Sequence, residues 1–271
     1  MTDPWGAAVQ VTDLNPAKEL RRFRRSFSLG KRILQGRNRP SDVERGCALV
    51  EVNRASRARM NRYASHHFVG DTLFARLGRA VCAAEAIPRK EFFETWEVAK
   101  KLRHRLRGRS IVELAAGHGF LSALLILFDD AIPSATCVDL SKPLSHERLY
   151  ESLIEVWPRL EGRVGYEQCR IEEVAIPPEA LVVSVHACGT ITDLVLDRAI
   201  AQGNPVAVVP CCHDFDRSDD GGLTPWMEPS LAIDAARAAR LANAGYRVVA
   251  TTIPEDITPR NRLLIGLPPT A

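Results

Sequence analysis

Residues 110–125, "SIVELAAGHGFLSALL", join an apolar run, an acid, a glycine turn and a second apolar run. Gly117 and Gly119 let the backbone of such a turn approach a ligand closely, because glycine adopts backbone angles that other residues avoid. The start of the helix that follows presents unpaired amide groups to the same ligand. The pattern predicts a site for a nucleotide-containing cofactor. The alternative is a tight strand-to-helix loop without a ligand.

The spacing around this turn discriminates between cofactors. A dinucleotide fold prefers a third glycine three positions after Gly119, where this chain has Ser122. Glu113 lies four residues before Gly117, and the resulting Glu-x-x-x-Gly-x-Gly pattern suits S-adenosylmethionine. Asp139 follows Gly119 by 20 residues, at the end of the next strand-like run, where an acid accepts both ribose hydroxyls. The candidate contacts in these two segments are Glu113, Ala115, Ala116, Gly117, Gly119, Asp139 and Leu140.

Strand-like and helix-like runs alternate after residue 110, and they must position these groups. The alternation implies an α/β fold with a mainly parallel, Rossmann-like sheet. Only residues 254–260 separate the last two strands, which is too short for a helical crossover, so an antiparallel last strand is expected. The expected strands are 111–115, 135–140, 163–169, 180–187, 205–211, 246–253 and 261–267, seven in all. One expected helix begins at residue 120, and the others cover 144–156, 191–201 and 229–243.

The front of the chain differs from the rest in pattern and in charge. Capping signals and apolar spacing predict helices over 15–30, 41–62, 71–84 and 88–106. Residues 1–109 carry a formal charge of +13 and residues 110–271 carry −10. Lys18–Arg39 alone holds nine basic residues and one acid, which could neutralise the phosphates of RNA. The alternative for this run is a solvated helical face. We expect a basic helical region over 1–87 and a cofactor-binding domain over 88–271.

The composition limits the class of protein. The chain has 271 residues, of which 46% are hydrophobic and 25% charged, so it can bury a large core. The longest nearly uninterrupted apolar run, residues 120–128, is far shorter than the roughly 18 residues of a membrane helix. The seven cysteines lack the spacing of a small disulfide scaffold, and the first residues do not resemble a secretory signal. We expect a cytoplasmic protein with reduced thiols and no membrane partner.

"VELAAGHGFLS" and the strand order resemble class I S-adenosylmethionine-dependent methyltransferases. "HACGTITDLVLDRAI" at 186–200 and "VVPCCHDF" at 208–215 resemble a branch that includes the eukaryotic tRNA ribose 2'-O-methyltransferases and related methyltransferase-like proteins. The likeness extends from about Pro88 to Gly266, and the zinc modules of the tRNA enzymes are not visible in the front part. The resemblance implies the class I sheet and S-adenosyl-L-methionine as cofactor. It also implies adenine contacts after the third strand, from Ile171 and Glu172.

In the class I sheet order the fourth and fifth strands are neighbours, so their ends should bring together His186, Cys188, Cys211, Cys212 and His213. Three interpretations compete for this cluster. The cysteines could be small apolar residues packed between strands. A histidine could orient or deprotonate a substrate. Thiolates and imidazoles could also bind zinc, but adjacent cysteines do not readily ligate one ion, so we predict no metal.

The strand-end segment also narrows the chemistry. Enzymes that methylate base amino groups often carry an Asn/Asp-Pro-Pro-aromatic turn after the fourth strand, and this chain has His-Ala-Cys-Gly at 186–189. Oxygen is therefore the favoured acceptor. His186 is the first candidate for the catalytic base and also a candidate cofactor contact, and Asp193 and His213 follow. For Asp193, helix capping or polar packing is the alternative.

These features predict an S-adenosylmethionine-dependent methyltransferase that acts on oxygen, with RNA as the preferred substrate class. A small-molecule methyltransferase whose N-terminal helices form a lid is the first alternative. The second is a non-catalytic module that binds the cofactor and either nucleic acid or a protein partner. The sequence leaves the oligomeric state open.

Overall fold

The computed structural model describes residues 52–105 and 107–269. These residues belong to one compact unit that starts at Val52. The helix expected over 15–30, most of the helix expected over 41–62 and the basic segment Lys18–Arg39 lie outside the described residues. Among the helices of the described part, none is both long and apolar enough to cross a membrane.

The strands of the described residues form a seven-stranded sheet with the order β3-β2-β1-β4-β5-β7-β6. Strand β7 pairs antiparallel with β5 and with β6, and β1 to β5 pair in parallel. This is the Rossmann-like sheet with an antiparallel last strand that the alternating pattern predicted, so the expected fold class is confirmed. The strands are β1 Ile111–Leu114, β2 Ala135–Asp139, β3 Val164–Gln168, β4 Leu181–Ser184, β5 Val206–Val208, β6 Arg247–Thr252 and β7 Arg262–Leu267.

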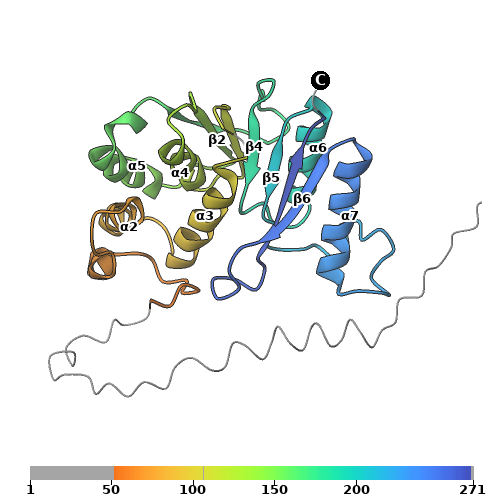
Figure 1. Ribbon diagram of the computed structural model, residues 1–271, viewed down its shortest axis with the longest axis horizontal. Coiled ribbons are helices and arrows are strands. Elements are labelled where there is room, and N and C mark those ends of the chain that lie inside the picture. Colours follow the sequence, from red (N-terminus) through yellow and green to blue (C-terminus); the bar gives the residue numbers. More distant parts are fainter. Residues whose placement is uncertain (1–51, 106, 270–271) are drawn as a thin grey trace, which may run out of the picture. The chain divides into compact units, whose positions relative to one another are not determined.

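Helices cover both faces of the sheet, as Figure 1 shows. Because side chains alternate across a strand, Ile111 belongs to the core cluster that includes residues of α2, α3, α4 and α5, and Val112 belongs to the cluster that includes residues of α6 and α7. In α4, every residue from Phe120 to Leu127 is buried, which explains its lack of a polar face. The helices are α2 Leu73–Ala84, α3 Arg89–Leu102, α4 Phe120–Phe128, α5 Ser145–Val156, α6 Ile191–Gln202 and α7 Pro229–Asn243. Two short 3-10 helices are η2 Arg62–His67 and η3 Pro158–Leu160.

Residues 52–87 pack into the same core as the sheet domain. The Phe68 and Phe92 rings meet edge to face, with their centroids 5.5 Å apart. A Cβ atom at position 78 would lie 2.1 Å from Phe68 Cδ1, so this helix position requires glycine. The predicted division between residues 87 and 88 therefore lies inside a continuously packed unit.

The prediction of a helix up to residue 62 is wrong for its described part, because residues 52–61 are not helical. Their backbone instead pairs with the segment before α3: the Met60 amide donates to Ile87 O over 2.9 Å, and the Arg89 amide donates to Ala58 O over 3.0 Å. These tertiary hydrogen bonds outweigh the local helix signal. The helices expected over 71–84 and 88–106 are present as α2 and α3.

Candidate functional site

The turn between β1 and α4 is shaped by glycines and held from both sides. Gly117 and Gly119 have φ of +52° and +67°, in the left-handed region that favours glycine. A Cβ on Gly119 would lie 2.5 Å from Cys137 Sγ in the neighbouring strand β2. The Tyr150 hydroxyl donates to Gly119 O over 2.6 Å, and the Tyr166 hydroxyl donates to Gly117 O over 2.8 Å. The turn is thus preformed before any ligand arrives.

Asp139, the last residue of β2, links this turn to the next loop. Its Oδ2 accepts from the Gly117 amide over 2.9 Å, and its Oδ1 accepts from the Leu140 amide over 2.7 Å. Each carboxylate oxygen has a second acceptor position, so the group can still bind a pair of hydroxyls. The structure therefore places Asp139 where the sequence predicted an acceptor for ribose.

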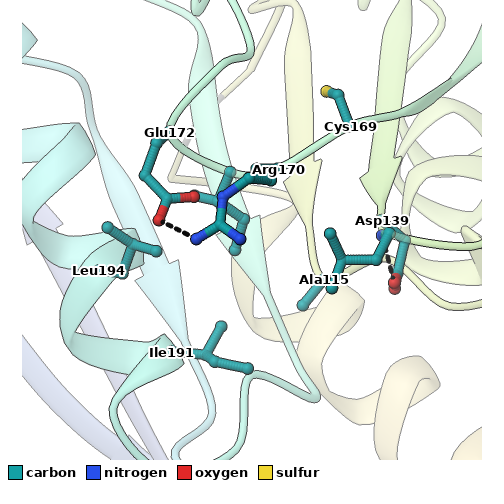
Figure 2. Close-up of a pocket in the computed structure, with 9 residues that line it drawn as sticks. Ala115, Asp139, Cys169, Arg170, Glu172, Ile191 and Leu194 are labelled. Atoms are coloured by element: carbon teal, nitrogen blue, oxygen red, sulfur yellow. Dashed lines mark hydrogen bonds and ion pairs between the residues drawn. The ribbon is translucent and has the colours of Figure 1, made fainter.

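A pocket of about 210 Å³ lies at the carboxyl ends of β1, β2 and β3 and at the start of α6. Figure 2 shows Asp139 on one side of it and Ile191 and Leu194, from α6, on the other. The Arg170 guanidinium bonds Glu172 Oε1 over 2.9 Å at the rim. The pocket is lined by Ala115, Asp139, Leu140, Cys169, Arg170, Ile171, Glu172, Ile191 and Leu194. It combines a carboxylate with apolar walls, as a nucleoside requires.

The structure brings five of the ten predicted cofactor contacts into this lining, and these are Ala115, Asp139, Leu140, Ile171 and Glu172. Ala116, Gly117 and Gly119 form the turn beside it without lining it. Sequence reasoning missed the other four lining residues, Cys169, Arg170, Ile191 and Leu194. The signal for the last two was the apolar residues at the exposed start of α6, where Ile191 remains 42% exposed.

Glu113 is buried behind the turn and does not line the pocket. Its Oε2 accepts from the Ser122 amide over 2.8 Å and from the Ser122 hydroxyl over 2.6 Å. Burial raises the pKa of Glu113 to about 7, because these hydrogen bonds only partly offset the loss of water. In this structure the carboxyl group joins β1 to the first turn of α4.

The buried carboxyl group predicts a pH dependence of stability. The folded state binds more protons than the unfolded state between the ordinary pKa and about 7, so the free energy of unfolding should fall as pH rises through this window. The loss should be at most on the order of 3 kcal/mol. Urea unfolding at several pH values should show this slope in wild type and not in Glu113→Gln. The exposed acid Glu151 provides the control, since Glu151→Gln should keep the wild-type slope. Equal slopes in wild type and Glu113→Gln would contradict the prediction.

His186 lies two residues beyond the end of β4, and it does not line the pocket. Its Nε2 is buried and has no hydrogen-bond partner among the described residues. A buried polar atom without a partner is costly, and seven other side-chain atoms of the described residues are in the same state. His186 thus lies beyond the carboxyl end of β4, and its catalytic role stays a prediction.

Asp193 and His213 belong to a buried ionic network. Both Asp193 oxygens accept from Arg237, over 2.9 Å from Nε and 2.7 Å from Nη2. Asp234 Oδ1 lies 2.8 Å from His213 Nε2 and 3.2 Å from Arg237 Nη1. Asp234 Oδ2 accepts from Arg262 over 2.6 Å. Both predicted catalytic candidates are thus occupied by partners that tie α6, α7 and β7 together, and His186 is the candidate with an unpaired nitrogen.

The three strand-end cysteines come together. Cys188 Sγ lies 3.5 Å from Cys211 Sγ, and Cys211 Sγ lies 3.9 Å from Cys212 Sγ. Burial and the neighbouring thiols raise the pKa of Cys211. Burial also acts to raise the pKa of Cys212, but hydrogen bonds from the other two thiols and the charge of Arg260 outweigh it and lower that pKa. The three thiols therefore lie in one cluster beyond the ends of β4 and β5.

Residues 90–215 match a family model described as a methyltransferase domain. A Glutathione S-transferase C-terminal domain-containing protein homolog from Drosophila pseudoobscura pseudoobscura is 26% identical, and the alignment covers 59% of this chain and 33% of that protein. The chain thus spans about a third of the length of the curated relatives that it matches. The matched segment includes β1 to β5 and the residues that line the pocket.

Two solved structures align with part of the chain. An O-methyltransferase family protein from Burkholderia thailandensis aligns with a TM-score of 0.44 at 16% identity, over 72% of this chain and 63% of that one. A B. subtilis tRNA methyltransferase aligns with a TM-score of 0.45 at 14% identity, over 64% of this chain and 65% of that one.

Proposed function

We propose that this chain is a methyltransferase that uses S-adenosyl-L-methionine and transfers its methyl group to an oxygen of RNA. The assignment of the cofactor rests on the pocket, in which Asp139 lies at the end of β2, opposite the apolar start of α6. Asp139 would accept the ribose hydroxyls. Leu140, which is 71% exposed, and Ile171 would cover the apolar faces of the adenosine.

Methyl transfer is an in-line displacement at a sulfonium carbon, and the bound cofactor supplies both the methyl group and the leaving group. The chain mainly has to orient the nucleophile and exclude water. The preformed glycine turn fixes one side of the reacting pair. A hydroxyl acceptor must lose its proton, and His186 Nε2, which has no partner among the described residues, would take it in the tautomer that leaves this nitrogen unprotonated.

RNA is proposed as the substrate class on the basis of charge. Residues 110–271, which line the pocket, carry a formal charge of −10, and the basic residues gather before them in the sequence. Counterion release from phosphates could supply the sequence-independent part of RNA affinity. The His-Ala-Cys-Gly segment at 186–189 supports an oxygen acceptor over an exocyclic amine.

Incubation with a methyl-labelled donor tests the function. Wild type should label the RNA fraction when RNA, protein and metabolite pools are offered separately, and Asp139→Ala should label it far more slowly. Label in the metabolite pool alone would favour the small-molecule alternative. No label in any pool, with the cofactor still bound, would favour the non-catalytic module.

The basic segment makes a separate prediction about RNA affinity. Replacing Arg21, Arg22, Arg24 and Arg25 together by Gln should weaken RNA binding and make its salt dependence shallower, because each lost phosphate contact removes about one released counterion. Affinity for S-adenosylmethionine should stay the same. Filter binding across a salt series measures how RNA affinity depends on salt in wild type and in the quadruple variant. Wild type that fails to retain RNA even at low salt would contradict the RNA proposal and leave the cofactor assignment intact.

A further inference from the structure

We propose that Cys188, Cys211 and Cys212 form a binding site for one zinc ion. The proposal does not depend on methyl transfer. The three Sγ atoms all lie within 4.8 Å of one another, and this is the group of potential metal-ligating side chains that the described residues bring together. Thiolates are preferred zinc ligands, and three protein ligands leave a fourth position for water.

The sheet explains why these residues meet. Strands β4 and β5 are parallel neighbours, and Ser184 pairs with Val208 at their carboxyl ends. The chain leaves both strands in the same direction, so Cys188 lies beside the Pro-Cys-Cys segment that follows β5. The Gly189 amide donates to Cys212 O over 3.0 Å and fixes the two loops to each other. The site is thus built by the core of the fold.

The distances match the geometry of zinc. With a Zn–S bond of about 2.3 Å, two thiolates of a tetrahedral site lie about 3.8 Å apart. The observed separations are 3.5 Å between Cys188 and Cys211 and 3.9 Å between Cys211 and Cys212. The third separation is at most 4.8 Å, which a small side-chain rotation of the exposed Cys188 could close.

Cys211 and Cys212 are adjacent in the sequence, and adjacent cysteines do not readily bind the same ion. Adjacent side chains usually diverge, because successive Cβ atoms of an extended chain point to opposite sides. Here β5 ends at Val208, and the two cysteines lie in the loop after it, where their Sγ atoms approach to 3.9 Å. The loop conformation therefore removes the objection that the sequence raised.

The surrounding charge also suits a three-thiolate ion. Three thiolates and Zn²⁺ carry a net charge of −1, and the Arg260 guanidinium donates to Cys212 Sγ over 3.1 Å. The same nitrogen donates to Cys211 O over 2.8 Å, which holds the guanidinium in place. A guanidinium that donates to a ligand sulfur neutralises the site and orients that ligand. On binding, each S–H bond is replaced by an S–Zn bond, and up to three protons go to the buffer.

Metal titration of the full chain tests the proposal. Reduced wild type should bind one equivalent of Zn²⁺. Co²⁺ in its place should give the sulfur-to-cobalt charge-transfer absorption and visible bands of a tetrahedral thiolate site. The Cys188→Ser variant should lose these bands and still fold, because the Cys188 side chain is exposed. Arg260→Met should weaken Co²⁺ binding about 10- to 100-fold.

Cys169→Ser is the matched control, because Cys169 lies at the same sheet edge but outside the cluster. It should keep the cobalt spectrum of wild type. The proposal is overturned if wild type gives no thiolate spectrum, or if Cys188→Ser gives the same spectrum as wild type. A protein that forms a Cys188–Cys211 disulfide and takes up no metal after reduction would also overturn it.

Discussion

Replacing His186 by alanine is expected to lower the turnover number about 100-fold or more and to leave affinity for S-adenosylmethionine nearly unchanged. A positioned general base contributes about 10²- to 10⁴-fold, and its role belongs to the transition state. The side chain does not line the cofactor pocket, and its buried Nε2 has no partner among the described residues. Steady-state kinetics together with a cofactor titration separates the two effects.

His104 supplies the control for this substitution, since it is exposed on the segment after α3. His104→Ala should match wild type in both measurements. If His186→Ala turns over at the wild-type rate, the side chain is structural and another group must take the proton. If it loses cofactor affinity in proportion to turnover, His186 is a binding residue.

Asp139→Ala is expected to weaken S-adenosylmethionine binding by roughly 1–3 kcal/mol, through the loss of charge-assisted hydrogen bonds to the ribose. The substitution also frees the amides of Gly117 and Leu140, both of which Asp139 holds. Asp139→Asn should not be a mild change, because its amide nitrogen would meet one of these two donors. Calorimetric titration of both variants measures the losses.

Asp197→Ala is the matched control for Asp139→Ala. Asp197 lies on α6, is 61% exposed at its side chain and contacts Arg240 outside the pocket. It should bind the cofactor as wild type does. If Asp139→Ala keeps wild-type affinity, the cofactor does not bind with its ribose on the end of β2.

Much of the fold could be predicted because each buried strand is a short apolar run. β1 and β4 are buried along their whole length, and each is apolar except for one residue, Glu113 in β1 and Ser184 in β4. The antiparallel pairing of β7 with β6 could be predicted because the loop between them is too short for a helical crossover. The segment 52–61 could not be predicted, because its backbone partners lie about 30 residues away in the sequence and compete with a local helix signal.

Site residues close to the glycine turn in sequence could be predicted. Site residues that come from other elements were harder to predict. Asp139 follows from its spacing to the glycine turn. Ile191 and Leu194 reach the pocket only because a crossover brings α6 to that edge. The direction of the cysteine side chains depends on loop conformation after β4 and β5, which residue types alone do not determine. The sequence shows Asp193 as a polar residue at the start of a helix, but it does not show that Arg237 is its partner.

Binding of the cofactor to the purified wild-type chain tests the central claim most directly. Isothermal titration with S-adenosyl-L-methionine should give saturable binding near one equivalent, and titration with NAD should give none, because Ser122 replaces the third glycine of a dinucleotide site. A chain that binds NAD and ignores S-adenosyl-L-methionine would contradict the account.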